Sequence, residues 1–418
     1  MRGHLIDLRP LRESRAFRRL WIGRTCSVVG GQLTLIAVLY QVWNRTGSTV
    51  WTGAVGLAQA LPIVALGLLA GSLVDRTDRR RLYLVMVTGQ AACSLLLAAQ
   101  SMIDGFPIAG IPVILAVQSC FSAGAGPASR TFIPHLLPRE RLSAGLALNQ
   151  ISFQGGMLAG PALGGLVIGW FGVTGCYAID VVTFACAFVG AFGLPMMRPD
   201  GEPARPGLRG IADGLGFLVR HPAVRGALLT DLAATVLSMP VSVFPLVNSE
   251  RFGGNPRTLG LFLTAIAVGG VTASVLSGVF TRMPPPGLVM LTGSAAWGLA
   301  LALFGLMTNP WTGLAFLVLA GAADTVSVVS RSTVIQLNTP SALLGRVSAA
   351  EQIVGQAGPD VGNLRAGLVA APTSALASLV SGGVLCVAAV AAVAVTTPSL
   401  RRFSAIPSAE PKSGQVTP

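Results

Sequence analysis

The sequence predicts an all-α integral membrane protein with about twelve transmembrane helices. Of its 418 residues, 52% are hydrophobic and 11% are charged, and the mean hydropathy is +0.69. An ordinary soluble domain has about 25% charged residues. The apolar residues form unbroken runs of about 20, a length that spans a hydrocarbon core of about 30 Å. Each run must be helical, because the core holds no water for unpaired backbone groups, and the alternating pattern of barrel strands is not seen.

Loop residues such as proline, asparagine and glycine separate the apolar runs and divide the chain into spans. The first apolar run is too long for a signal peptide and lacks a cleavage site, so it is counted as the first helix. We expect spans at residues 20–43, 51–72, 82–101, 108–128, 143–169, 174–194, 223–247, 259–281, 287–307, 311–334, 346–370 and 373–397.

The positive charge indicates the orientation of the chain in the membrane. The net charge is +13, from 28 Arg and one Lys against 16 acids. The termini and even-numbered loops, with the helix ends that adjoin them, hold 25 of these basic residues, and the odd-numbered loops hold four. Such asymmetry marks cytoplasmic loops and attraction to anionic lipid. It predicts cytoplasmic termini and argues against nucleic acid as a partner.

The chain divides into two halves at a hydrated, proline-rich stretch. Residues 208–220 within this stretch have apolar residues at helical spacing and predict an amphipathic surface helix. The expected parts are a cytoplasmic N-terminal segment (1–19), a six-helix bundle (20–194), a cytoplasmic linker (195–222), a second six-helix bundle (223–397) and a disordered cytoplasmic tail (398–418).

The two halves resemble each other in sequence. Ser129-Arg130-Thr131 follows the fourth span, and Ser330-Arg331-Ser332 occupies the matching place in the tenth. Each is followed by a proline and by an Arg-x-Ser-Ala segment, at Arg141 and Arg346. Matches at corresponding positions indicate two six-helix pseudo-repeats, an architecture found in many secondary transporters.

The loop between the second and third spans contains the most specific motif, which runs from Gly71 to Arg81. It could be an ordinary basic loop, but its glycine, acid and basic pair resemble the signature of the major facilitator superfamily. The resemblance implies the major facilitator fold and a cytoplasmic gate, in which Asp75 lies near a helix N-terminus and near a basic residue. Asp78 stands where the family usually has glycine. The gate residues implied are Gly71, Asp75, Arg76, Arg79, Arg80 and Arg130.

The fifth span has a glycine-rich motif with a central proline. Small residues at intervals of four form a flat face that allows close helix packing, and packing alone could explain them. The Gly-Pro-x-x-Gly-Gly core also resembles the motif of antiporters in this superfamily, which implies export. The motif residues are Gly156, Gly160, Pro161, Gly164 and Gly165.

Further residues resemble one branch of the superfamily, which contains the enterobactin exporter and macrolide and multidrug efflux pumps. They include Gln41-Val42 in the first span and Gly321 to Asp324 in the tenth. The resemblance extends from about Phe17 to Leu400. An acid often expected beside Gly31 or Gln32 is absent, and so is the arginine of the helix 4 proton motif known in other drug antiporters.

Acids inside the spans are the candidate coupling groups, because an intramembrane charge is costly and usually functional. Asp324 lies 13 residues after Trp311, which places it about 20 Å deep at 1.5 Å per residue. A carboxyl at this depth can take up and release protons. Arg331 lies two turns further along and is expected to pair with Asp324 in one conformation, or else permanently. The candidate residues for coupling and the substrate cavity are Asp324, Arg331, Asp231, Asp180, Gln32 and Gln41.

These observations predict a secondary exporter for an amphipathic small molecule of the drug, macrolide or siderophore class, driven by proton antiport. A dedicated siderophore exporter and a non-transporting scaffold or sensor remain alternatives. No nucleophile motif or metal-ligand cluster suggests an enzyme, and Lys412, the one lysine, is not in a nucleotide-binding loop. We expect a monomer in the bacterial cytoplasmic membrane, with no metal and no cofactor, whose partners are the substrate, protons and lipid.

Overall fold

The computed structural model describes residues 7–74, 77–130, 132–196, 216–277, 285–340 and 343–401. Throughout these ranges the regular structure is helical, with no strand. The gate residues Asp75 and Arg76 lie outside the described residues. So does most of the linker: of the amphipathic helix predicted at 208–220, only 216–220 can be compared, and these residues are helical.

The N-terminal half forms six long helical segments. Its α7 contains two of them, which meet at Gly172. This residue adopts φ 68°, a conformation that favours glycine, and the chain reverses there between the fifth and sixth spans. The elements are α1 (Arg9–Glu13), α2 (Arg15–Thr46), α3 (Thr49–Val74), α4 (Arg79–Ser101), α5 (Gly110–Arg130), α6 (Phe132–Leu136) and α7 (Arg139–Phe192).

The C-terminal half also forms six long segments, but the first is broken. The elements are α9 (Pro222–Ser238), η1 (Val241–Val243), α10 (Phe244–Arg251), α11 (Pro256–Val275), α13 (Pro286–Leu306), α14 (Pro310–Asn338), α15 (Leu344–Ala370), α16 (Ala375–Thr396) and α17 (Pro398–Arg401). The span expected over 223–247 lies within the apolar stretch Pro222–Arg251, but its helix is interrupted. The chain leaves the helix at Met239, next to Pro240, which has no N–H to continue the hydrogen-bond ladder.

The predicted number of spans is confirmed within the described residues. Nine helical elements there are long and apolar enough to cross a membrane. One of the nine is α7, which supplies two crossings on either side of Gly172. The remaining two are α5, whose apolar part is shorter, and α15, which carries Glu351, Asp360 and Arg365 along its length.

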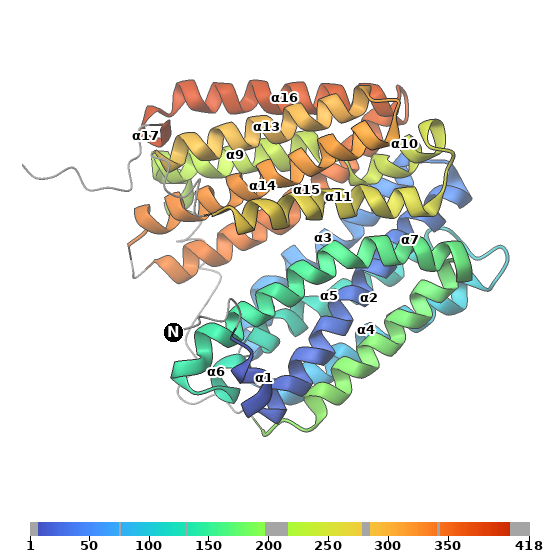
Figure 1. The fold of residues 1–418 in the computed structure, drawn as a ribbon, viewed down its shortest axis with the longest axis vertical. Coiled ribbons are helices and arrows are strands. Elements are labelled where there is room, and N and C mark those ends of the chain that lie inside the picture. Colours follow the sequence, from blue (N-terminus) through green and yellow to red (C-terminus); the bar gives the residue numbers. More distant parts are fainter. Residues whose placement is uncertain are drawn as a thin grey trace, which may run out of the picture.

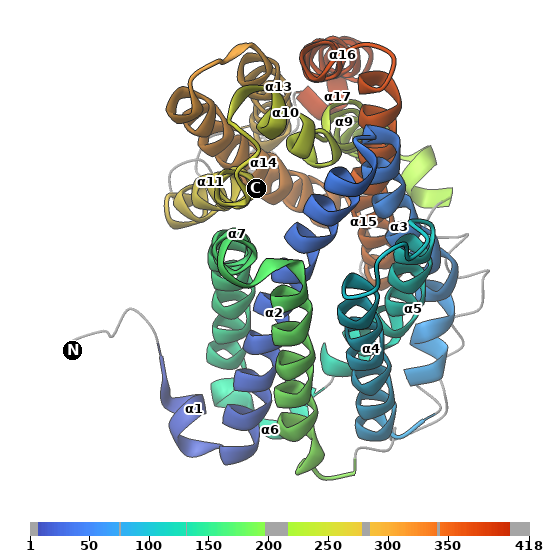
Figure 2. The same cartoon turned by 90° about the vertical axis from the view of Figure 1, so that its right-hand side faces the viewer.

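Figure 1 shows the two halves as separate helical layers, with α9 to α17 above and α1 to α7 below. The view from the side in Figure 2 shows that α7 and α3 of the first half lie closest to α11 and α15 of the second. Most of the apolar core lies within one half or the other: one cluster contains Phe244, Phe262 and Phe304, and others contain Phe17 and Phe132. Leu39 of α2 joins the cluster of the second half, so the two cores meet at this point.

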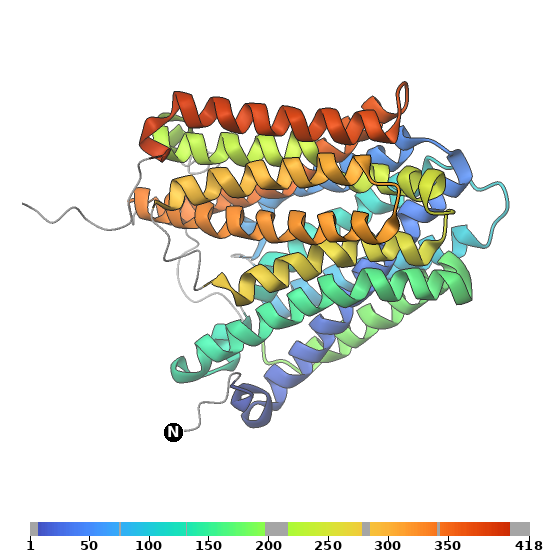
Figure 3. The ribbon, with the colours of Figure 1, turned by 45° about the horizontal axis from the view of Figure 1, so that its top comes forward.

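The halves are held together near one end of the molecule. The Thr49 hydroxyl donates to the carbonyl of Gly367 at 2.8 Å, and the Thr52 hydroxyl donates to that of Ser242 at 2.7 Å. Thr49 begins α3, and Gly367 lies near the end of α15. Figures 1 and 3 show that this end of the molecule, where α10 lies, is opposite to the end with α1, α6 and α17.

Candidate functional site

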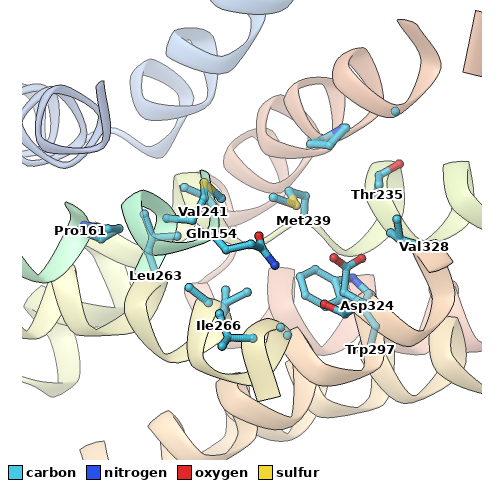
Figure 4. Close-up of a pocket in the computed structure, with 18 of the residues that line it drawn as sticks. Gln154, Pro161, Thr235, Met239, Val241, Leu263, Ile266, Trp297, Asp324 and Val328 are labelled. Atoms are coloured by element: carbon cyan, nitrogen blue, oxygen red, sulfur yellow. The ribbon is translucent and has the colours of Figure 1, made fainter. Parts of the chain in front are cut away.

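A cavity of about 380 Å³ lies between the two halves. Gln32 of α2 and Gln154 of α7 line it from the first half. The second half contributes residues from α9, η1, α11, α13, α14 and α15. Figure 4 shows Gln154 extending toward the side where Asp324 and Trp297 lie, while Leu263 and Ile266 form an apolar wall. The cavity is thus amphipathic, with its acids on the side of the second half.

Asp324 lies at the middle of α14 and faces this cavity. Among the described residues its carboxyl has no hydrogen bond and no ion pair, although the side chain is largely enclosed. A charged group inside a membrane protein is costly unless it is paired or hydrated. The position of Asp324 therefore suits a group that exchanges a proton or a ligand with the cavity.

Arg331 pairs with other acids, contrary to the expectation that it would pair with Asp324. It forms ion pairs with Asp231 of α9 and with Glu351 of α15, the latter at 3.3 Å. Arg331 and Asp231 side chains are each only 11% exposed. Seven residues along a helix separate Asp324 from Arg331 by about 10 Å, so acids on the neighbouring helices are closer partners. The three charges join α9, α14 and α15 within one half.

Arg365 stabilises the break after α9, and its role was missed from the sequence. Its Nη1 donates to the carbonyl of Leu237 at 2.7 Å. That carbonyl is among the last in α9, where no further turn supplies a donor and where a cation is favoured by the helix dipole. Trp297 Nε1 donates to Ser238 Oγ at 2.9 Å beside it. An arginine within a predicted span was the available signal, because such a charge needs a partner.

A second cavity, of about 370 Å³, lies mainly within the first half and contains Asp180. Asp180 is fully buried, and its carboxylate accepts hydrogen bonds from Thr34 at 2.8 Å, Ser94 at 2.7 Å and Thr183 at 3.2 Å. Gln118 donates in turn to Ser94 at 3.0 Å. Asp180 therefore does not share the central cavity with Asp324.

Asp360 of α15 also lines this second cavity, although it belongs to the other half. It lies near the middle of α15, which extends from Leu344 to Ala370. Gln41 lines neither cavity: it exchanges hydrogen bonds with Gln100 and accepts one from Tyr177 at 2.7 Å. These three buried side chains satisfy one another, which removes Gln41 from the set of cavity residues.

The glycine motif of the fifth span packs against two partners. A Cβ at Gly160 would lie 2.4 Å from Gln32 Cβ, and one at Gly156 would lie 2.4 Å from Val28 Cγ1, both on α2. A Cβ at Gly165 would lie 2.6 Å from the carbonyl oxygen of Pro256, at the start of α11 in the other half. Glycine is required here because backbone and side-chain atoms approach closely.

Two further contacts complete this description of the motif. Gly164 lies against Ile36 of α2, where a Cβ would come within 3.3 Å of the Ile36 Cβ. The carbonyl oxygen of Pro161 lies against Gly260 of α11, 2.3 Å from an added Cβ. The motif thus fixes α7 to α2 on one side and provides a contact between the halves on the other.

The gate motif lies at the end of the molecule that carries α1 and α6. Gly71 is in the last turns of α3, and Arg130 ends α5. Arg79 Nη1 lies 3.2 Å from His135 Nε2, and Arg80 donates to the carbonyl of Phe192. Asp78, which departs from the family pattern, caps α4 by accepting from the backbone N–H of Arg81 at 2.8 Å.

Comparisons with known proteins agree with this architecture. The enterobactin exporter EntS of Shigella boydii serotype 18 is 28% identical over 408 residues, which cover 96% of this chain and 97% of that protein. EntS of Escherichia coli O1:K1 is 27% identical over 408 residues, with the same coverage of the two chains. A mutant of the nucleoside transporter NupG has a similar fold, with a TM-score of 0.76, 12% identity, and coverage of 92% of this chain and 100% of that one.

A bacterial homologue of the human lysosomal transporter Spinster, crystallised in an inward-facing and unoccupied conformation, has a TM-score of 0.69 and 16% identity. The match covers 96% of this chain and 98% of that structure. The model of the transmembrane secretion effector family matches residues 6–416, almost the whole chain. The protein is therefore a multi-pass membrane transporter that belongs to the transmembrane secretion effectors of the major facilitator superfamily.

Proposed function

We propose that the protein exports an amphipathic small molecule by proton antiport, with alternating access to a cavity between its halves. The observation that supports this most strongly is the unpaired carboxyl of Asp324 in that cavity. A scaffold or sensor has no need of such a costly group. In the proposed cycle, substrate and proton use the cavity in turn, and Asp324 carries the proton. Asp231 and Glu351 are held in ion pairs with Arg331, so Asp324 is the acid of the cavity that is left to exchange the proton.

The orientation follows from the distribution of charge. We assign the termini, and with them the gate motif, to the cytoplasm, as the 25 basic residues on that side indicate. With this orientation, the contacts of Thr49 and Thr52 lie on the outer side, which supports an inward-open assignment for this conformation. The gate residues, including Asp75, Arg79 and Arg80, are proposed to close the cytoplasmic side in the opposite state. The bacterial cytoplasmic membrane is the compartment in which the antiport would operate.

The cavity favours a substrate with both an apolar and a polar part. Met157, Met239 and Leu263 supply adaptable apolar surface, because methionine fills irregular shapes. Trp297 and Gln32 supply an aromatic face and an amide. Lipid-soluble drugs and macrolides fit this description. A dedicated siderophore exporter is the second candidate, because the similar proteins named above are enterobactin exporters.

The test is transport by purified protein in liposomes with an imposed pH gradient. Ethidium, erythromycin and iron-free enterobactin serve as probes, and liposomes containing the Asp324→Asn variant serve as the control. We expect gradient-driven movement of at least one probe, with loss of the uphill component in the variant. Movement of enterobactin alone favours the dedicated siderophore exporter. Deletion and overexpression in the native host, with susceptibility testing and a siderophore assay, extend the test to cells. If neither liposomes nor cells show export, the proposal is wrong.

A further inference from the structure

The interface of α3 and α15 contains the carboxyl of Asp360, which has no part in the proton exchange proposed for Asp324. Close glycine contacts line this interface. A Cβ at Gly53 would lie 2.9 Å from the carbonyl oxygen of Asn363, and one at Gly367 would lie 2.2 Å from that of Thr49. Between these points and the centre of the molecule, a Cβ at Gly56 would lie 3.2 Å from Asp360 Oδ1. Asp360 therefore lies directly beside α3, at the inner edge of the closed contact.

Asp360 has no partner of opposite charge at this place. Among the described residues its carboxyl makes no hydrogen bond and no ion pair. Of the described residues that line its cavity, the only other charged group is Asp180, which is also an acid. The lining that α3, α4 and α5 provide around it consists of glutamines, serines and apolar residues.

Among the described residues, no cation on the elements packed against α15 forms an ion pair with Asp360, and Arg225 of α9 is exposed near the start of that helix. Neither α3 nor η1 contains a titratable residue. The acid of α9 that faces this region, Asp231, is paired with Arg331. On α15 itself Arg365 is bound to the carbonyl of Leu237, and on α16 the Cys386 thiol donates to Ser294. An ionised Asp360 would therefore be uncompensated in the closed interface.

The position of Asp360 gives it access to different sides in different states. It lies seven residues before Gly367, about 10 Å inside the sealed end. With α3 and α15 in contact, the polar cavity of about 370 Å³ is the space that it faces. That cavity has room for roughly a dozen waters at about 30 Å³ each. Separation of α3 from α15 would expose the same carboxyl to the solution on the sealed side.

From this geometry we infer that Asp360 is a second proton-binding site, which locks the α3–α15 contact when it is protonated and releases it when it is ionised. An uncompensated charge in a helix interface costs free energy, so the contact forms more readily with the neutral carboxyl. A ligand shifts an equilibrium between two states only if it binds one state more tightly than the other. Here the proton binds Asp360 more tightly in the sealed state than in the separated state. The sealed fraction must then decrease as pH rises. The inference rests on the proposed alternation between two states, although not on any substrate.

The test measures the separation of the two halves at the sealed end, without a substrate. Spin labels are attached at Asn44→Cys and Thr373→Cys, at the sealed end, in a background where the six native cysteines are replaced. Distances between the two spin labels are measured by double electron–electron resonance in liposomes. The pH is varied from about 5 to about 9, the range over which buried carboxyls titrate. We expect the short-distance population to decrease with rising pH in the labelled parent. Asp360→Asn should keep the short distance at every pH.

Control variants separate this explanation from others. Asp104→Asn, which removes an exposed loop acid beyond the end of α4, should behave as the parent. Gly56→Ala, which crowds the contact sterically, should favour the long distance at every pH. Asp360→Ser replaces Asp360→Asn if the amide impairs folding. A parent without pH dependence, or a neutral variant that keeps the dependence of the parent, would overturn the inference. Either result would leave the proposed export of the probe compounds unaffected. Conversely, a failure to observe export would not contradict the pH-dependent contact of α3 with α15.

Discussion

Asp324→Asn should stop uphill export without destabilising the protein, whereas Arg331→Gln should destabilise it. Asp324 has no partner among the described residues, so its replacement by an amide breaks no interaction there. Arg331 holds two acids, Asp231 and Glu351, in a setting where the Arg331 and Asp231 side chains are each only 11% exposed. Its removal leaves two neighbouring carboxylates without compensation. The loss of a buried partner of this kind costs about 3–5 kcal/mol.

Asp231→Asn should lower the stability of the protein more than Asp324→Asn does and less than Arg331→Gln does. It leaves Arg331 and Glu351 as a neutral pair and removes one charge-assisted contact, worth about 1.5–3 kcal/mol. The expected order of destabilisation is thus Arg331→Gln, then Asp231→Asn, then Asp324→Asn with almost none. The double variant of Asp231→Asn with Arg331→Gln should be more stable than Arg331→Gln alone, because it carries one unpaired acid fewer.

The assay combines two readouts on the same preparations. Thermal stability is measured in detergent by size-exclusion chromatography after heating, and transport is measured in liposomes with and without a pH gradient. Asp324→Asn should match the parent in stability and in downhill exchange, and lose at least tenfold in uphill export. If Asp324→Asn is as unstable as Arg331→Gln, and Arg331→Gln rescues it, then Asp324 is one member of a structural pair and the reasoning fails.

Three other predictions concern topology, packing and the gate. An enzyme reporter active only outside the cytoplasm should be silent when fused after Pro418 and active when fused near Asn309; the opposite result reverses the proposed orientation. Gly160→Leu should abolish transport, since even a Cβ would lie 2.4 Å from Gln32 Cβ. Gly155→Leu should be tolerated, because a Cβ there would meet no atom of a neighbouring element within 4 Å. Equal transport by these two variants contradicts the packing argument. Asp75→Asn should reduce transport strongly at normal expression, and unchanged transport would mean that the motif is only a topological charge cluster.

The spans could be predicted from the sequence because the bilayer imposes their length. Hydropathy fixed the helices to within a few residues, and Gly172 marks a turn that was expected between 169 and 174. The break at Met239–Pro240 was not predicted. A proline in a membrane helix is often accommodated with only a kink, and here the break depends on donors from elsewhere in the fold, such as Arg365 and Trp297.

The candidate site was predictable in composition but not in pairing. Depth along the chain identified Asp324, and Asp231 and Arg331 line the same cavity. In this structure Arg331 pairs with Asp231 of α9 and Glu351 of α15 and not with Asp324, because acids on neighbouring helices lie closer than one two turns along the same helix. Asp180 and Gln41 have hydrogen-bond partners on other helices, which no periodicity reveals. Such choices depend on how helices are placed against one another.

The way in which the halves meet explains why they can separate. All ion pairs found among the described residues lie within a single half. The contacts between halves described above are close helix approaches at glycines, the apolar contact of Leu39 and two hydroxyl hydrogen bonds, from Thr49 and Thr52. A hydrogen bond of this kind contributes only about 0.5–1.5 kcal/mol. Inside the second half, by contrast, Arg331 and Arg365 fix helices with charged contacts. An equilibrium between two arrangements then requires only a few kcal/mol, which protonation of one or two carboxyls can supply.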